Sequence, residues 1–322
     1  MPTSTNGSPD AVAPAFAVDI GGSRIRVAAV SPDLTLQPIY ATPDVSGGPA
    51  GLVKQLEGLV RMACEGSPLS AGVVATPGAV NSHTGTISSA TNLPLTGYPL
   101  GDALSQRLGV DVKVVVDTAA AAVAEFGASG AAADCSIGAY VTVSTGIGTS
   151  LVVDGRVVEG AHSRAGELGH VPVRTGPEAE PCPCGQRGCL EMYASGAGLA
   201  RLSGRAGGPT GAAAVLDAAR HGEPGARQLV EQAVDLLCRA LAGLVHVLDP
   251  AAVVLGGGLL LGGRLLEVLV QRLGEIIVIP GWSARSVLRE AAHGDLSPLT
   301  GAAALAAGTP AAMRLIGWKV PT

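Results

Sequence analysis

Aromatic residues are scarce in this chain of 322 residues, which contains two Phe, two Trp and four Tyr. So few rings make a stacking platform for single-stranded nucleic acid unexpected. Basic residues are also in the minority, because 21 Lys and Arg stand against 26 Asp and Glu and give a formal net charge of −5. Nucleic-acid-binding domains normally carry a basic surplus. We therefore expect no nucleic-acid partner.

Long apolar runs are absent as well. No stretch reaches the length of about 18 uninterrupted apolar residues that a transmembrane helix needs. The first fifteen residues contain no Lys or Arg and no apolar core, so they do not resemble a secretory signal. We expect a cytoplasmic protein with no membrane partner. Residues 1–14 are expected to form a disordered N-terminal tail. In the cytoplasm the six cysteines are expected to be thiols or metal ligands rather than disulfides.

The composition is that of a folded protein, since 47% of the residues are apolar and the length allows about two domains. A strand, a glycine turn and a second strand occur at residues 15–30, around Gly21 and Gly22. The same pattern recurs at residues 139–153. Two such units about 125 residues apart indicate an internally duplicated fold.

Helices and strands alternate along the rest of the chain, which favours an α/β class with largely parallel sheets. We expect a domain boundary close to residue 118 and a glycine-rich loop at residues 201–211. The predicted elements are helices at 49–64, 118–127 and 231–248 and strands at 72–75, 112–116 and 252–255.

The most specific motif is PCPCGQRGCLE at residues 181–191. It places Cys182, Cys184 and Cys189 within eight positions, and His170 lies twelve residues upstream. Three thiolates and one imidazole are the ligand set of a closed, structural zinc site. Chance clustering of buried cysteines is the weaker alternative.

GELGH, at residues 166–170, stands just before this motif. Glu167 and His170 are three residues apart and would share a face on a helical turn. If one ring nitrogen of His170 binds zinc, the other is free to contact a ligand. Glu167 and Glu191 flank the cysteines and suit a polyhydroxylated substrate, because carboxylates accept hydrogen bonds from hydroxyls. Each could instead be a solvated surface residue.

Three glycine-rich turns follow predicted strands, and together they favour a nucleotide-phosphate site. Backbone amides unshielded by a Cβ can bind anionic oxygens, and Asp19 beside the first turn could hold Mg²⁺. None of the turns matches a Walker loop or a Rossmann fingerprint. Each turn alone could be an ordinary hairpin. The turns are Asp19-Ile20-Gly21-Gly22-Ser23, Thr145-Gly146-Ile147-Gly148 and Gly256-Gly257-Gly258.

Asp117 ends the strand predicted at residues 112–116. A carboxylate there could accept the proton of an attacking hydroxyl in phosphoryl transfer. Asp is also a favoured residue for capping a following helix, and the two roles are compatible.

Together these motifs resemble those of the ROK family of sugar kinases, bacterial glucokinases among them, within the actin/hexokinase-like ATPase superfamily. The resemblance extends from Phe16 to about Ala307. The pieces that carry it are DIGGSRIRVAAV, ATPGAV, TNLP, VVVDTAAAAVAE, VSTGIGTSLVVDG, AGELGH, CPCGQRGCLE, VVLGGGL and GDLSPLTGAAALA.

The resemblance implies a duplicated actin/hexokinase (ribonuclease H-like) ATPase fold of the α/β class, with two domains and a cleft between them. The small domain would span residues 15–117 and the large domain, with the zinc loop, residues 118–299. A last helix at about 300–316 would return to the small domain. Closure over the sugar would exclude water and limit ATP hydrolysis.

The resemblance also implies the activity, which is ATP-dependent phosphorylation of a primary hydroxyl on a hexose or hexose-like polyol. The implied cofactors are ATP, Mg²⁺ and structural Zn²⁺, and a homodimer is expected. Asp117 matches the general base and contacts the sugar. Further sugar-contacting positions are Asn92, Glu167, His170 and Glu191; zinc ligands are His170, Cys182, Cys184 and Cys189; ATP and metal positions are Asp19, Gly21, Gly22, Ser23, Thr145, Gly146, Gly148, Gly256, Gly257 and Gly258.

The chain departs from the family at two places that bear on the acceptor. The family has Asn-Asp-Ala-Asn around its base, whereas this chain has Val116-Asp117-Thr118-Ala119. The family's Trp shortly after Asn-Leu-Pro is also missing beyond Asn92. Polar groups in a pocket decide which hydroxyl patterns it accepts, so the substrate need not be glucose and could be a cyclitol of secondary metabolism.

Two other classes of function compete with the kinase. ROK relatives include transcription regulators with a winged helix-turn-helix ahead of the kinase-like body, but here the first strand is predicted near residue 15. A sugar-binding protein without activity is the other alternative. The absence of the two Asn residues favours it, whereas Asp19, Asp117 and the glycine turns favour a kinase.

Overall fold

The structure is a computed structural model, and it describes residues 13–81, 84–90, 93–260 and 264–319. Apart from its last two residues, the predicted disordered tail at 1–14 lies outside the described residues. The first strand begins at Ala15, where the sequence places it.

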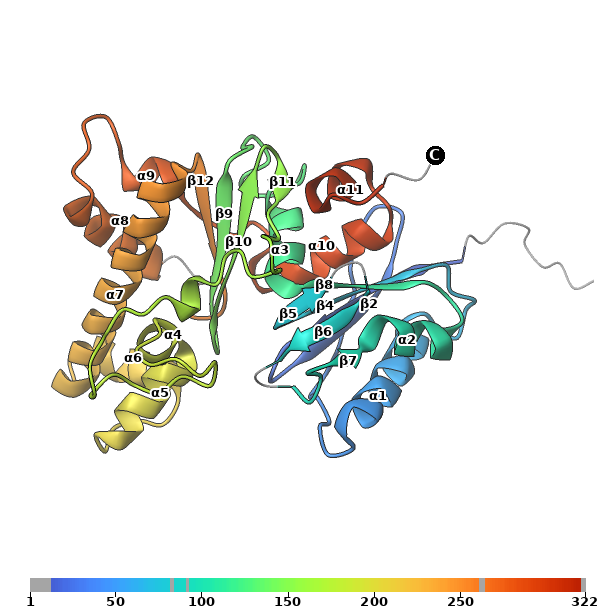
Figure 1. The fold of residues 1–322 in the computed structure, drawn as a ribbon, viewed down its shortest axis with the longest axis horizontal. Helices are drawn as coiled ribbons and strands as arrows, with labels where there is room; N and C mark the ends of the chain where they lie inside the picture. Colours follow the sequence, from blue (N-terminus) through green and yellow to red (C-terminus); the bar gives the residue numbers. More distant parts are fainter. Residues whose placement is uncertain (1–12, 82–83, 91–92, 261–263, 320–322) are drawn as a thin grey trace, which may run out of the picture.

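The first half of the chain forms a five-stranded sheet with the order β3-β2-β1-β4-β8. β1, β2 and β3 are antiparallel neighbours, and β4 and β8 extend the sheet parallel to β1. Helices α1 and α2 cover one face (Figure 1), and a separate three-stranded sheet, β5-β6-β7, was not predicted. The bounds are β1 Ala15–Ile20, β2 Ile25–Val30, β3 Ile39–Ala41, α1 Gly48–Ala63, β4 Gly72–Thr76, β5 Ala79–Asn81, β6 Thr86–Ser89, β7 Tyr98–Pro99, α2 Leu100–Leu108 and β8 Val112–Val116.

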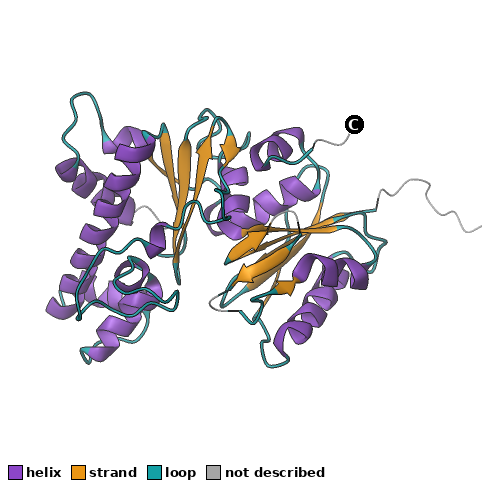
Figure 2. Cartoon of the chain, in the orientation of Figure 1, coloured by secondary structure: helices purple, strands orange, loops and turns teal. Residues whose placement is uncertain are grey.

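The second half repeats this sheet, with the order β11-β10-β9-β12-β13 and the same pattern of antiparallel and parallel neighbours. Helices α7 and α8 cover its outer face, and α4, α5 and α6 pack near one end of α7 (Figures 1 and 2). The predicted duplicated α/β fold is therefore confirmed. The bounds are β9 Gly138–Val143, β10 Ile147–Val153, β11 Arg156–Val157, α4 Glu191–Ala194, α5 Gly196–Arg205, α6 Ala212–Arg220, α7 Pro224–Leu248, β12 Ala252–Gly256, α8 Arg264–Ile276, α9 Ala284–Val287 and β13 Leu288–Glu290.

Two helices lie between the sheets, α3 (Asp117–Glu125) and α10 (Ser297–Ala306), as Figure 1 shows. α3 follows β8 but packs mainly against β9 and β10, whereas α10 packs against β1, β2 and β4. The two helices also pack against each other. Gly301 of α10 allows this approach, because a Cβ there would overlap the carbonyl oxygen of Ala120.

The alternation of side chains along each strand creates this layered core. On β1, Phe16 and Val18 face the helices α1 and α2, while Ala17 faces the central helices. On β12, Val253 faces α7 and α8, while Val254 faces the centre. Small residues line much of the central layer, so the helices approach the sheets closely.

A buried carboxylate ties α3 to the segment that leads into α10. Glu125 is fully buried and accepts hydrogen bonds from the amides of Ala292 (2.9 Å) and His293 (3.0 Å) and from the hydroxyl of Ser297 (2.7 Å). A buried carboxylate is tolerated where several donors replace its water. The two crossing helices are thus joined at this end by polar bonds as well as by packing.

Three predicted elements were wrong in extent. The expected loop at 201–211 is helical as far as Arg205, where it forms the second half of α5; Ser195 caps the start of this helix by accepting from the Gly198 amide (3.0 Å). α7 begins at Pro224, seven residues before its predicted start. The expected single helix at about 300–316 is two helices, α10 and α11 (Pro310–Ile316), bent by 108°. The bend follows Gly308, whose φ of 65° ends α10, and Pro310 then begins a new helix.

The domain boundary close to residue 118 stays a prediction.

Among the described residues, no single helix is long and apolar enough to cross a membrane. The bent pair at 294–306 and 310–316 meets that test only when both parts are taken together.

Candidate active site

Asp117 occupies the junction of β8 and α3. It is the first residue of the helix. Val116 before it holds the capping position and makes no side-chain capping hydrogen bond, so the expected capping role of Asp117 is wrong. The Oδ1 of Asp117 accepts a hydrogen bond from the Thr118 amide at 2.7 Å. Burial raises the pKa of Asp117 to about 7, and the negative charges of Asp19 and Glu167 contribute to the rise. A carboxylate with this pKa can exchange protons near neutral pH.

Two carboxylates from separate segments of the chain, Asp19 and Glu167, act on Asp117. Asp19 stands near the carboxyl end of β1, and Asp117 follows β8, which runs parallel to β1 in the same sheet with β4 between them. The carboxyl ends of parallel strands lie at one edge of a sheet, where open α/β proteins bind ligands. Glu167 belongs to the other half of the chain. The fold therefore brings three carboxylates into one electrostatic group.

The first glycine turn is held by a backbone hydrogen bond from Gly21 to the Arg24 carbonyl (2.7 Å). Beside it Asp19 is buried and forms an ion pair with Arg26, in which Nη1 lies 2.7 Å from Oδ2. Burial raises the pKa of Asp19, and Arg26 opposes that rise.

The second and third glycine turns lie against each other. Gly257 has a φ of 89°, and a Cβ there would meet the Val143 carbonyl at 2.5 Å. That same carbonyl accepts a hydrogen bond from the Leu259 amide (3.1 Å). The predicted ATP-binding turn that follows Val143 and the predicted ATP-binding turn at Gly256–Gly258 are therefore neighbours.

The Cys/His cluster assembles as its spacing predicts. One donor atom from each of His170, Cys182, Cys184 and Cys189 lies within 4.8 Å of the other three. The Sγ atoms of Cys184 and Cys189 are 3.7 Å apart. Two thiolates on one tetrahedral zinc would lie about 3.8 Å apart, given Zn–S bonds of about 2.3 Å. The donor set and its spacing therefore fit zinc.

His170 connects this cluster with the carboxylates. Its Nδ1 lies 3.7 Å from the Sγ of Cys182, while its Nε2 lies 3.6 Å from Oε2 of Glu167. Glu167 and His170 lie on the same face because residues 168–170 form a 3₁₀ turn. Gly166 and Gly169 hold this turn against β10, where a Cβ at either position would overlap a backbone carbonyl.

Glu191 begins α4, directly after the cysteine motif. Its Oε2 accepts a hydrogen bond from the Ile147 amide at 2.8 Å, across 44 residues of sequence. It thus contacts the second glycine turn, which the sequence did not predict. Asn92, also expected to contact the sugar, lies outside the described residues.

A family model described as the ROK family matches residues 15–309. The chain belongs to the ROK family.

Several relatives that match this chain are named as sugar kinases. The glucokinase of Thermotoga maritima is 31% identical over 268 residues, which cover 77% of this chain and 83% of the relative. The N-acetyl-D-glucosamine kinase of Pectobacterium atrosepticum is 31% identical over 307 residues, covering 90% and 98%. The crystal structure of a ROK family glucokinase from Streptomyces griseus in complex with glucose and AMPPNP superimposes with a TM-score of 0.78 and 27% identity, covering 91% and 98%. These matches confirm the predicted family and the prediction of a sugar kinase.

Within this ROK fold, sequence reasoning missed Arg26 and its second partner. Arg26 Nη2 donates to Oδ2 of Asp295 at 2.9 Å, and these residues are 269 positions apart. The only hint was the presence of both residues in motifs that the family shares. Thr118 was also missed, and its hydroxyl accepts from the Ser150 hydroxyl at 2.9 Å, joining α3 to β10.

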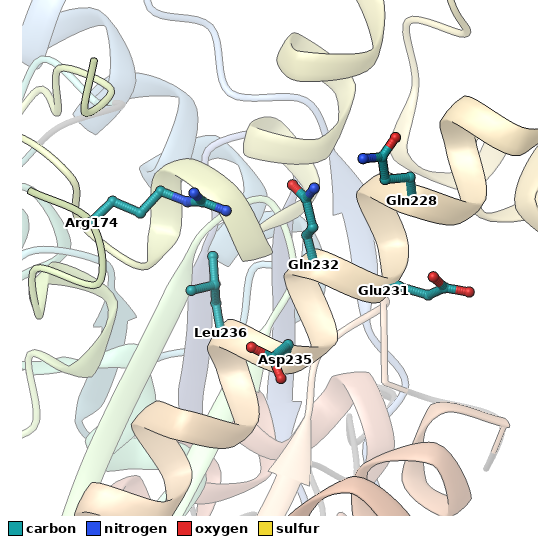
Figure 3. Close-up of a pocket in the computed structure, with 6 residues that line it drawn as sticks. All are labelled: Arg174, Gln228, Glu231, Gln232, Asp235 and Leu236. Carbon is teal, nitrogen blue, oxygen red and sulfur yellow. The ribbon is translucent and has the colours of Figure 1, made fainter.

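A pocket on the surface of α7 shares no residue with these groups (Figure 3). Arg174 stands at one side of it and lies over the ring of Tyr193, 5.3 Å from its centroid. The helix contributes the rest of the lining, namely Gln228, Glu231, Gln232, Asp235 and Leu236. The pocket contains none of the carboxylates or glycine turns described above.

Proposed function

We propose that the protein is an ATP-dependent kinase that phosphorylates a primary hydroxyl of a hexose or hexose-like polyol, with Asp117 as the general base. One observation carries the proposal. Asp117 has a pKa raised to about 7 by burial, within electrostatic reach of Asp19 at the first glycine turn and Glu167 at the Cys/His cluster. Perturbed carboxylates beside candidate ligand groups are typical of catalytic sites.

In the proposed reaction Asp117 orients the acceptor hydroxyl and takes its proton. The hydroxyl oxygen forms a bond to the γ-phosphorus as the bond to the β-phosphate oxygen breaks, and ADP leaves. A base whose pKa lies near 7 is ionised in a large fraction of molecules at neutral pH and is still basic enough to accept a proton. Most of the remaining catalysis is positioning and charge stabilisation.

Backbone amides of the glycine turns would bind the phosphates of ATP. Mg²⁺, when bound, supplies positive charge to the phosphate oxygens, and Asp19 would hold it directly or through water. The residues proposed for this site are Asp19, Gly21, Gly22, Ser23, Thr145, Gly146, Gly148, Gly256, Gly257 and Gly258.

Zinc on the Cys/His cluster would fix the loop that carries the acceptor site. With Nδ1 of His170 committed to the cluster, its Nε2 is available to an acceptor hydroxyl, as is the carboxylate of Glu167. Glu191 and Asn92 complete the proposed contacts. Where the family has Asn, Val116 and Ala119 put apolar groups beside Asp117. The edge of the acceptor that an Asn amide would contact is therefore expected to differ from that of glucose. A cyclitol, which keeps most hydroxyls and alters one edge, would fit such a pocket.

The test is a coupled ADP-release assay with glucose, N-acetylglucosamine and a cyclitol as acceptors. At least one acceptor should raise ADP release above background. Asp117→Ala should lower that turnover at least about 100-fold while AMPPNP still binds. Asp111→Ala, an exposed Asp before β8, is the matched control and should keep full turnover. Near-normal turnover in Asp117→Ala would remove the mechanism, and acceptor binding without any ADP release would favour a non-catalytic sugar-binding protein.

A further inference from the structure

The second glycine turn is fastened by one short segment of the chain, residues 191–197. The Gly196 amide donates to the Ser144 carbonyl (2.8 Å), and the Ala197 amide donates to the Thr145 carbonyl (3.1 Å). The third bond is the one from the Ile147 amide to Glu191. Both ends of the turn are thus tied to the start of α4 and α5.

Of these three bonds, only the one to Glu191 uses a side chain. The Ile147 amide is committed to Oε2 of Glu191 and so is not available to a phosphate oxygen. A Cβ at Gly146 would overlap the same Oε2, so a larger residue there would have to displace the carboxylate. The carboxylate therefore lies directly against the turn and anchors its backbone at Ile147.

The position of Glu191 is set in turn by the Cys/His loop. Glu191 follows Cys189 by two residues, and between them the Leu190 amide donates to the Val171 carbonyl (2.9 Å). Leu190 itself is fully buried. The segment cannot shift without disturbing either the cluster or the core, so the backbone that carries Glu191 is fixed.

We propose that Glu191 is a positioning residue for the nucleotide, which holds the turn Thr145–Gly148 in its phosphate-binding conformation. This inference rests on the proposed function, because it takes that turn to be part of the ATP site. It assigns Glu191 a second role, in addition to the acceptor contact that the family resemblance implies. A hydrogen bond to a charged acceptor is among the stronger polar interactions in proteins, so its loss should be measurable.

The test measures the Kd of AMPPNP by calorimetry without any acceptor, so that the acceptor contact does not contribute. Glu191→Ala leaves the Ile147 amide without its acceptor, and the Kd should rise about tenfold. Glu191→Gln keeps an acceptor oxygen but loses the charge, so its Kd should stay within about threefold of the unmodified protein. This pair of variants separates the hydrogen bond from electrostatic repulsion between the carboxylate and the phosphates.

A second arm uses the crowding at Gly146. In the unmodified protein, Gly146→Ala should displace the carboxylate and weaken AMPPNP binding about tenfold. Once Glu191→Ala has removed the carboxylate, adding Gly146→Ala should cost nothing more, because the space is then open. Gly243→Ala, on the exposed face of α7 with nothing near its Cβ, should leave the Kd unchanged. If Glu191→Ala fails to fold, an unchanged Kd in Gly146→Ala alone would still overturn the inference.

The outcomes separate the inference from the proposed function. If the unmodified protein binds no AMPPNP, the proposed function is wrong and the inference falls with it. If it binds AMPPNP while Glu191→Ala and Gly146→Ala bind equally well, the kinase proposal stands and the positioning role is wrong. A Gln variant as weak as the Ala variant would likewise overturn it, since the hydrogen bond would then not be what matters.

Discussion

Arg26 on β2 lies directly across the first hairpin from Asp19 on β1, with Nη1 2.7 Å from Oδ2. The same guanidinium reaches Asp295, just before α10. The Asp19 side chain is 5% exposed and that of Arg26 14% exposed, so the pair is largely withdrawn from water. Arg26 therefore neutralises a carboxylate at the proposed ATP site and joins the two halves of the chain.

Arg26→Met should lower the free energy of unfolding by about 3 kcal/mol, because it leaves Asp19 buried without its counterion. Arg24→Met is the matched control. Arg24 is 55% exposed and lies 3.8 Å from Asp295, so removing its charge should cost less than about 0.5 kcal/mol. Urea unfolding at pH 7.5 measures both variants. Equal, small losses would show that Asp19 does not depend on Arg26.

The activity should depend on pH through Asp117. Its pKa in the free protein is about 7, so log kcat/KM should rise with unit slope below pH 7 and level off above it. Buffers from pH 5 to 9 with a saturating ATP concentration give the profile. A plateau that extends down to pH 5 would contradict the assignment of Asp117 as the base.

The same residue should make the protein less stable at high pH. Because the pKa of Asp117 is higher in the folded chain than in the unfolded chain, the folded state binds the proton more tightly between about pH 4 and pH 7. Its contribution to stability therefore falls as the pH rises through that range. Asp117→Asn should add on the order of 2 kcal/mol at pH 8, about half the upper bound for such a shift, and less at pH 5. An equal gain at both pH values would point to packing instead.

The purified protein should contain about one zinc ion per chain, measured by elemental analysis. Cys189→Ser should lose the metal and lower stability on the order of 4 kcal/mol, because a ligand that binds only the folded state stabilises it. Cys135→Ser removes a thiol that is not in the cluster and should keep both metal and stability. Full zinc content in Cys189→Ser would exclude this residue as a ligand.

Gly301→Ala should destabilise the crossing of α3 and α10 by about 1–3 kcal/mol, since the new Cβ would overlap the Ala120 carbonyl. Gly243→Ala, in the interior of α7 with open space around it, should instead add up to about 1 kcal/mol through helix propensity. Thermal unfolding should therefore show opposite signs for the same chemical change. If Gly301→Ala also raised the stability, α3 and α10 would be able to move apart without cost.

Local pattern was enough to predict much of this molecule. Alternating apolar residues and glycine turns located β1, β2, β9 and β10, and β8 was predicted with its observed bounds. The Cys/His spacing predicted the cluster, because its four ligands lie within twenty residues and short segments have few ways to fold around an ion. The predictions were wrong where the local sequence pattern favoured one structure and tertiary contacts stabilised another. Residues 201–205 look like a glycine-rich loop but are held in α5 by Arg201, which forms an ion pair with Glu180 and donates to the Met192 carbonyl (2.9 Å).

By itself, the sequence determined where the chain turns and which side chains can bind a metal or accept a proton, since these depend on residue type and short-range spacing. Only the tertiary structure decided that α3 and α10 exchange sheets, that Arg26 reaches Asp295, and that Glu191 supports the turn at Ile147. A hydrophobic face shows that an element must be covered but not what covers it. A carboxylate likewise shows that it needs a donor but not which donor, and that choice belongs to the packed fold.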